Sequence, residues 1–215
     1  MNHNFSRFVD PAVTPETDEE RTARMLAERK EATRRNREAV FAAVCPAEYA
    51  AFNPARCANP RAHAEVVRLV KSGKSCRIVG MTGSGKTFAV WAGLRCLIMR
   101  GLNPVVYSGV AFASRSSEAY SADDRAGDWL DSVAGAPVLF IDDWGKEAFT
   151  ETQERALFEI IERRSAWVGK QTILATNRTA SDILRQQREA KKETGRTEDI
   201  LRRLSQRFEH VQFRD

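Results

Sequence analysis

Eight consecutive residues have the types and spacing that bind a phosphate chain. The segment GMTGSGKT, which begins at residue 80, fits the pattern G-x-x-x-x-G-K-[ST] at every fixed position. Glycines let the backbone approach phosphates without a Cβ clash, and successive N–H groups then form an anion nest at a helix start. Lys86 is expected to reach the β and γ phosphates, and Thr87 to offer its hydroxyl to Mg²⁺. The predicted nucleotide contacts are Gly80, Thr82, Gly83, Ser84, Gly85, Lys86 and Thr87.

Two carboxylates follow a hydrophobic run further along the chain. The run Val138-Leu139-Phe140-Ile141 leads directly into Asp142 and Asp143. An acid at the end of a buried strand near a phosphate loop supplies a Mg²⁺ contact, usually through water, which is the role predicted for Asp142. Asp143 is predicted to polarise the attacking water.

An amide and a basic segment complete the set of chemical candidates. Asn177 follows the apolar strand Thr172–Thr176, where a neutral amide can orient water or bind the γ phosphate without adding negative charge. The segment RRLSQRF at residues 202–208 carries Arg203 and Arg207. An arginine there can reach the γ phosphate bound to a neighbouring subunit. The spacing alone favours ordinary surface charge on a helix.

These side chains need strands and helices that bring them together. Apolar strands are predicted at residues 75–79, 104–108, 137–143, 171–177 and 210–213. Helices are predicted at 61–72, 87–98, 151–168, 181–189 and 197–207, with helical segments in 109–134 around a polar break at 115–121. In the helix at 151–168, Trp167 continues the apolar spacing of Leu157, Ile160 and Ile161. The alternation indicates an α/β fold with a mostly parallel sheet covered on both faces, with ligands at the carboxyl ends of its strands.

The first 44 residues differ in composition from the rest. Residues 1–16 are predicted to be flexible, and a highly charged helix follows from Thr17 to Val44, opened by a Thr17–Glu20 capping box. Its few apolar side chains leave two interpretations open: a docking arm for a partner protein, or a solvated helix lying on the core. The segments 46–60 and 188–196 are expected to be loop-rich and mobile, respectively. The predicted division is 1–44 as the arm and 45–215 as the nucleotide-binding domain.

Composition limits the class of protein. The 215 residues are 42% hydrophobic and 29% charged, which is typical of a soluble globular protein. The N-terminus lacks the apolar core of a signal peptide, and no apolar run approaches the ~18 residues of a membrane span. A cytoplasmic location with no membrane association is therefore expected. The net charge of +5 permits nucleic-acid binding without demonstrating it.

The order GMTGSGKT, VLFIDDWGKE, TILATNR and ILRRLSQRF resembles the AAA+ ATPases of the bacterial helicase-loader and initiator group. The nearest match is the DnaC/IstB-like branch, and the resemblance covers about residues 45–215. It implies a P-loop three-layer sandwich that binds ATP and Mg²⁺, with Lys86 and Thr87 as Walker A contacts and Asp142 and Asp143 as the Walker B pair. It further implies that Asn177 is sensor 1, that Arg207 is the arginine finger with Arg203 in reserve, and that residues 110–134 hold the extra helix of this clade.

Two departures from the family pattern matter. Asp143 stands where Glu is common, so hydrolysis is expected to be slow, and Glu147 is a candidate to assist. The helical lid of many AAA+ proteins is also expected to be absent, so closure around ATP would rely on neighbouring subunits. ATP-dependent self-association follows from that expectation.

Four functions remain open at this point. The first is an ATP-dependent loader of a replicative ring helicase, held through the N-terminal helix and acting on single-stranded DNA with salt-sensitive backbone contacts. The second is a transposition helper ATPase that binds DNA and recruits a transposase. The third is an ATP-switched adaptor that hydrolyses slowly. A small-molecule kinase is disfavoured, because the strand at 104–108 offers no carboxylate for an acceptor site.

Overall fold

The computed structural model describes residues 16–51, 57–121, 125–146, 148–190 and 195–214. Its centre is a five-stranded sheet in the order β2-β3-β4-β1-β5, in which every neighbouring pair is parallel. The strands are β1 (Cys76–Val79), β2 (Pro104–Ser108), β3 (Val138–Asp142), β4 (Gln171–Thr176) and β5 (Glu209–Gln212). This confirms the predicted α/β sandwich with a parallel sheet, and it places the ends of β1, β3 and β4 side by side.

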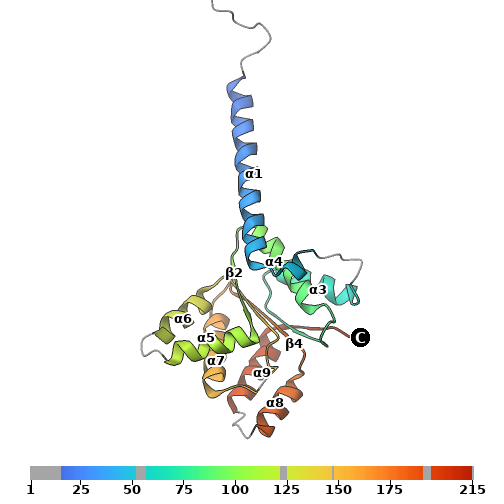
Figure 1. Ribbon diagram of the computed structural model, residues 1–215, viewed down its shortest axis with the longest axis vertical. Helices are drawn as coiled ribbons and strands as arrows, with labels where there is room; N and C mark the ends of the chain where they lie inside the picture. The colour runs from blue at the N-terminus through green and yellow to red at the C-terminus, as the bar shows by residue number, and fades with distance from the viewer. Residues whose placement is uncertain (1–15, 52–56, 122–124, 147, 191–194, 215) are drawn as a thin grey trace, which may run out of the picture.

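Helices cover both faces of the sheet (Figure 1). One face packs on α3 (Pro60–Lys71) and α4 (Lys86–Met99), and the other on α5 (Gly109–Ser121), α6 (Arg125–Gly135), α7 (Glu151–Ala166), α8 (Ala180–Glu189) and α9 (Gly195–Arg207). The alternation along β3 explains the two cores: Phe140 enters the first and Ile141 the second. None of the helices in the described ranges is long and apolar enough to cross a membrane.

Several sequence predictions about individual segments are wrong. The polar break at 115–121 does not exist, because α5 continues to Ser121 and buries Phe112, Ser116 and Ala119 on one face. Its polar residues satisfy one another locally, as in the Arg115–Glu118 ion pair. Trp167 does not join the buried stripe of α7: it caps the end of that helix and is 55% exposed.

Other segments match only in part. The stretch predicted as loop-rich contains a short helix, α2 (Ala47–Ala50), and residues 52–56 lie outside the described ranges. The segment predicted to be mobile is helical at both ends, in α8 and α9, and residues 191–194 are not described. Of residues 1–16, which are predicted to be flexible, only Glu16 is among the described residues, and Glu147 is not described.

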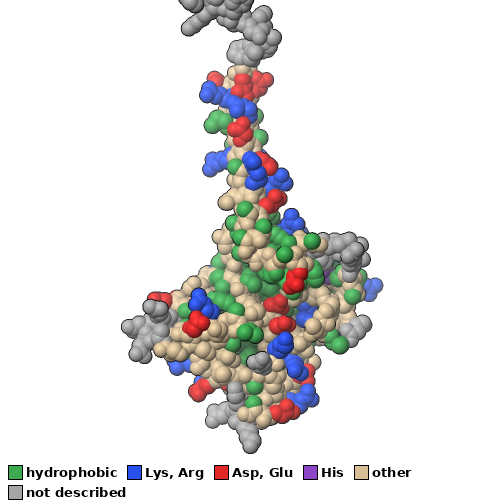
Figure 2. Space-filling view, in the orientation of Figure 1, with side chains coloured by type: hydrophobic (Ala, Val, Ile, Leu, Met, Phe, Trp, Pro, Cys, Tyr) green, Lys and Arg blue, Asp and Glu red, His purple; other side chains and the backbone are tan. Residues whose placement is uncertain are grey.

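The helix α1 (Asp18–Val44) projects away from the sheet (Figure 1). The predicted Thr17–Glu20 capping box is present and starts it. Charged side chains of both signs cover the projecting part, and hydrophobic side chains gather where it meets the body (Figure 2). The projecting part of α1 does not lie along the core.

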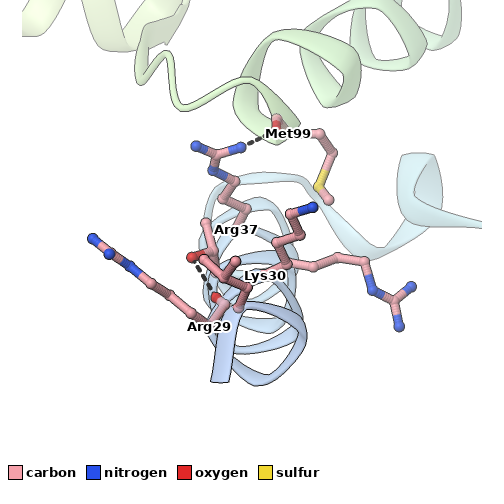
Figure 3. A pocket seen from close by; sticks show the side chains of 7 residues that line it. Arg29, Lys30, Arg37 and Met99 are labelled. Carbon is pink, nitrogen blue, oxygen red and sulfur yellow. Dashed lines mark hydrogen bonds between the residues drawn. The ribbon is translucent and has the colours of Figure 1, made fainter. Parts of the chain in front are cut away.

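The base of α1 is fixed to α4. The Phe41 ring makes an edge-to-face contact with Trp91 at 6.2 Å, and the Arg95 guanidinium lies 5.4 Å from the Phe41 ring centroid. The Arg37 guanidinium donates to the carbonyl of Met99, at the carboxyl end of α4 (Figure 3). A cation at this end of a helix is favourable because the unpaired carbonyls are negative there. The last two turns of α1 therefore belong to the packed body, and only the earlier turns form a free arm.

Candidate nucleotide-binding site

The phosphate-loop segment joins the carboxyl end of β1 to the start of α4, as its sequence pattern requires. Gly80 has no room for a side chain, because an added Cβ would lie 2.6 Å from the Cβ of Phe213. Gly83 and Gly85 have φ values of +82° and +95°, a region that residues with side chains rarely adopt. Three of the predicted loop glycines are therefore required by close packing or by backbone conformation.

Lys86 is buried at the start of α4, with its ammonium turned onto the loop itself. Its Nζ donates to the carbonyl oxygens of Gly80 at 2.8 Å and Met81 at 2.7 Å. Burial lowers the pKa of Lys86, and the nearby carboxylates of Asp143 and Asp142 oppose that shift. Phosphate oxygens are stronger acceptors for an ammonium than neutral carbonyls are. The present partners of Lys86 can thus be exchanged for a nucleotide.

Thr87 and Asp142 meet directly. The Thr87 hydroxyl donates to Asp142 Oδ2 at 2.9 Å, and the backbone N–H of Asp143 donates to Asp142 Oδ1 at 3.0 Å. Burial raises the pKa of Asp142, while the Thr87 hydrogen bond lowers it. One hydroxyl and one carboxylate, side by side next to a phosphate loop, form the protein contribution that Mg²⁺ needs when phosphates supply further oxygens. These residues fit that ion.

Asp143 adopts a left-handed backbone conformation, with φ of +50°. The turn is held from behind, because Trp144 donates its backbone N–H to the Ala175 carbonyl at 2.9 Å and is itself buried. Gly109 lies so close that an added Cβ would be 2.7 Å from the Asp143 carbonyl oxygen. Neighbouring strands thus fix the turn and leave Asp143 exposed beside Asp142.

Asn177 lies beside the loop, as predicted from its place after β4. Its Nδ2 is 3.4 Å from the Thr82 hydroxyl. Its Oδ1 and the Ser84 hydroxyl are buried and have no hydrogen-bond partner within the described part of the chain. Buried polar atoms rarely stay unpaired, so both groups are available to a bound nucleotide or an ordered water. Lys86, Thr87, Asp142, Asp143 and Asn177 therefore converge on one end of the sheet.

Arg207 lies at the other end. It ends α9 just before β5, whose Glu209 pairs with Cys76 at the start of β1. The phosphate loop begins beyond Val79, which is about 10 Å further along the strand at ~3.3 Å per residue. Arg207 is exposed and forms no ion pair with any described residue. It cannot serve its own subunit's site, which leaves the predicted action on a neighbour.

Arg203, the reserve candidate, is engaged inside its own chain. Its guanidinium pairs with Glu162 and lies 4.6 Å from the ring centroid of Phe158. Only 18% of its side chain is exposed. Arg203 therefore fastens α9 to α7 and is a weaker candidate for reaching another subunit.

Two residues near the site were missed by the sequence analysis. Asn59 precedes α3, where Asn followed by Pro is typical of a helix start, yet its Nδ2 is directed to the Ser84 carbonyl at 3.4 Å. The Tyr49 ring packs edge-on against Phe88 of α4 at 4.9 Å. Burial raises the pKa of Tyr49 to about 12, with smaller contributions from Glu48 and from the acids Asp142 and Asp143. Sequence spacing gives no signal for either contact, because each joins separate segments.

Together the sheet order and this site define an ATP-binding P-loop protein of the AAA+ class. The family model for the IstB-like ATP binding protein matches residues 4–214, and the chain belongs to that family. A comparison with curated proteins found no match.

Solved structures agree on the fold. The DnaC helicase loader is 21% identical with a TM-score of 0.57, covering 70% of this chain and 87% of that one. DnaI is 18% identical with a TM-score of 0.64, covering 80% and 95%. The replication initiator DnaA bound to AMPPCP and single-stranded DNA is 19% identical with a TM-score of 0.60, covering 74% of this chain. The chain spans about half (47%) of that DnaA chain, and the expected relation to helicase loaders and initiators is confirmed at the level of fold.

Proposed function

We propose that this protein binds ATP with Mg²⁺, hydrolyses it slowly in the cytoplasm and uses it to load a replicative ring helicase onto single-stranded DNA. Lys86 and the loop amides hold the phosphates, while Thr87 and Asp142 hold Mg²⁺. Asp143 and Asn177 orient the attacking water. Asp143 is one methylene shorter than the usual Glu, which is the reason to expect slow turnover. Arg207 completes the site of an adjacent subunit.

The observation that carries the loader role is the projecting part of α1. This arm extends away from the nucleotide-binding body, and its base is bonded to α4, the helix that starts at Lys86. A groove of about 410 Å³ runs beside it, as seen in Figure 3. The groove combines apolar side chains with cationic ones. Its lining residues are Leu26, Arg29, Lys30, Thr33, Arg34, Arg37 and Met99. An apolar segment with acidic flanks on the helicase is the partner surface that this groove suits.

The second candidate is a transposition helper that binds DNA and recruits a transposase. The match to the IstB-like family favours it, because the branch includes such helpers as well as helicase loaders. Both functions use the same ATP site and the same arm, so the partner protein decides between them.

The partner test uses the full-length protein and Leu26→Glu. Leu26 is 53% exposed and lies in the groove, so the substitution should abolish capture of the replicative helicase in a pull-down with ATP. Ala32→Glu is the matched control, because Ala32 is exposed on the same helix and does not line the groove. It should leave capture unchanged. Capture of a transposase in place of the helicase would establish the second function, and helicase capture that is equal in both variants would contradict docking through this groove.

A further inference from the structure

An exposed apolar turn lies at the amino ends of the strands. Trp167 and Val168 connect α7 to β4; Trp167 is 55% exposed and Val168 is fully exposed. Lys170 ties the turn to the body, because it lies 5.4 Å from the Trp167 ring centroid and donates to the Gly135 carbonyl at the end of α6. Large apolar side chains held outward in this way are typical of an interface. We call Trp167 and Val168 the knob.

The knob stands next to Arg207. Trp167, Lys170 and Arg207 line one cavity of about 150 Å³, together with the buried Arg164. Arg164 is fully engaged, since it donates to Thr172 Oγ1 and to the carbonyls of Val133, Ala134, Ala136 and Gln171. No carboxylate among the described residues lines this cavity. The cavity beside the knob therefore carries positive charge that no carboxylate in its lining balances.

A second cavity, of about 220 Å³, lies next to Asp143 at the carboxyl ends of the strands, opposite the knob. Its walls include the aromatic rings of Phe112, Trp144 and Phe149, and Val110, which is 74% exposed, stands at its lip. The indole N–H of Trp144 is buried and has no acceptor in the described structure. Pockets for drug-sized ligands span ~300–1,000 Å³, so this smaller space suits one or two side chains. We call it the aromatic cavity.

We propose that the knob of a second copy of this chain inserts into the aromatic cavity when the two copies share a nucleotide. This rests on the proposed function, in which Arg207 reaches the γ phosphate of a neighbour. Arg207 and Trp167 of the knob line one cavity, and Asp143 borders both the nucleotide site and the aromatic cavity. When Arg207 approaches the phosphate, Trp167 and Val168 are brought to the neighbouring cavity.

Charge and shape both favour a second copy as the occupant. The knob face offers Lys170 and Arg207, and the receiving face offers Asp142, Asp143 and the bound triphosphate. A backbone carbonyl of the inserted knob can accept a hydrogen bond from the indole N–H of Trp144. The two surfaces differ, so the contact is head-to-tail and can extend to further copies. The knob thereby helps to position Arg207 without touching the reacting atoms.

The experiment measures self-association by sedimentation velocity, with Mg²⁺ and a non-hydrolysable ATP analogue. Val168→Asp damages the knob and Ala113→Leu fills the aromatic cavity, and each alone should weaken association by about tenfold or more. Leu102→Asp and Ala111→Leu are matched controls, since both residues are exposed and line neither feature. Both controls should associate like the unaltered protein.

Mixing the two damaged proteins gives the sharpest result. A Val168→Asp subunit keeps its cavity and an Ala113→Leu subunit keeps its knob, so a mixed pair has one intact contact and should form at close to the unaltered affinity. A mixture no better than either variant alone would overturn the proposal. If Ala113→Leu lowers the melting temperature, Val110→Asp at the lip replaces it.

Two further readouts separate this proposal from the proposed function. Binding of a fluorescent ATP analogue is measured on the same samples. Unaltered protein that binds nucleotide yet stays monomeric overturns the knob contact alone, whereas protein that binds no nucleotide overturns the proposed function. Loss of oligo-dT binding in Ala113→Leu with self-association intact would assign the aromatic cavity to a nucleobase and would also overturn the proposal.

Discussion

The two ends of the five-stranded sheet carry different functional groups: the phosphate loop and two aspartates at the carboxyl end, and Arg207 beside an exposed tryptophan at the amino end. At the carboxyl end, Lys86 donates to two carbonyls of the phosphate loop, and Thr87 donates to Asp142. At the amino end, Arg207 is exposed near the exposed Trp167, and Lys170 donates to the Gly135 carbonyl. β1 is only four residues long, but its two ends are still about 10 Å apart. Arg207 and the phosphate loop of the same chain therefore cannot act on one nucleotide. The difference is what the proposal of a site shared between two subunits requires, with the phosphate loop from one and Arg207 from the other.

The largest expected effect removes the cation from the carboxyl end. Lys86→Ala should weaken ATP binding by at least ~100-fold, because a charge-assisted contact to two phosphates is lost from a buried position. Titration with a fluorescent ATP analogue measures it. Lys74→Ala is the control at the amino end of β1, where Lys74 pairs with Glu209 at an exposed position. Tight binding retained in Lys86→Ala would refute the assignment of the phosphate loop.

A smaller loss is expected from the amino end. Arg207→Ala should leave ATP binding unchanged and lower ATPase activity by about 10- to 1,000-fold, because the arginine stabilises charge only in the transition state. Mixing Arg207→Ala with Lys86→Ala should restore activity, since the second variant supplies Arg207 to the intact loop of the first.

Arg203→Ala is the matched control for the mixing assay. Arg203 is bound to Glu162 and Phe158 in its own chain, so its removal should cost about 1 kcal/mol of stability and produce no loss that mixing rescues. An activity loss in Arg207→Ala that persists in every mixture would mean that the two ends do not meet.

The smallest effect concerns stability at the carboxyl end. Burial raises the pKa of Asp142 in the folded state, so its ionised form lowers stability at neutral pH. Asp142→Asn should therefore raise the melting temperature of the nucleotide-free protein by about 2–4 °C, equivalent to about 1 kcal/mol. The gain should vanish as the pH falls below the ordinary carboxyl pKa of about 4, where Asp142 is protonated in both states. Calorimetry at several pH values tests it, and a lower melting temperature at pH 7 would contradict the inferred cost.

Short-range patterns were sufficient for the parallel sheet, the capping box of α1 and the order of the polar groups along the chain. The loop pattern, the apolar run before Asp142 and the strand before Asn177 each depend on neighbours within a few residues. Hydrophobic periodicity gave a wrong prediction at α5, where polar residues such as Arg115 and Glu118 pair within the helix and no break occurs. It was also wrong at Trp167, because α7 ends at Ala166 and Trp167 is not part of its buried face.

By itself, the sequence determined which chemical groups the protein carries and that those after β1, β3 and β4 share one end of a sheet, because hydrophobic periodicity and chain direction are local properties. Only the tertiary structure decided that Phe213 excludes a side chain at Gly80, that α1 projects from α4, and that Arg207 and Trp167 line one cavity. Those facts depend on packing between segments far apart in the chain, where the free energy comes from burying surfaces that no local pattern brings together.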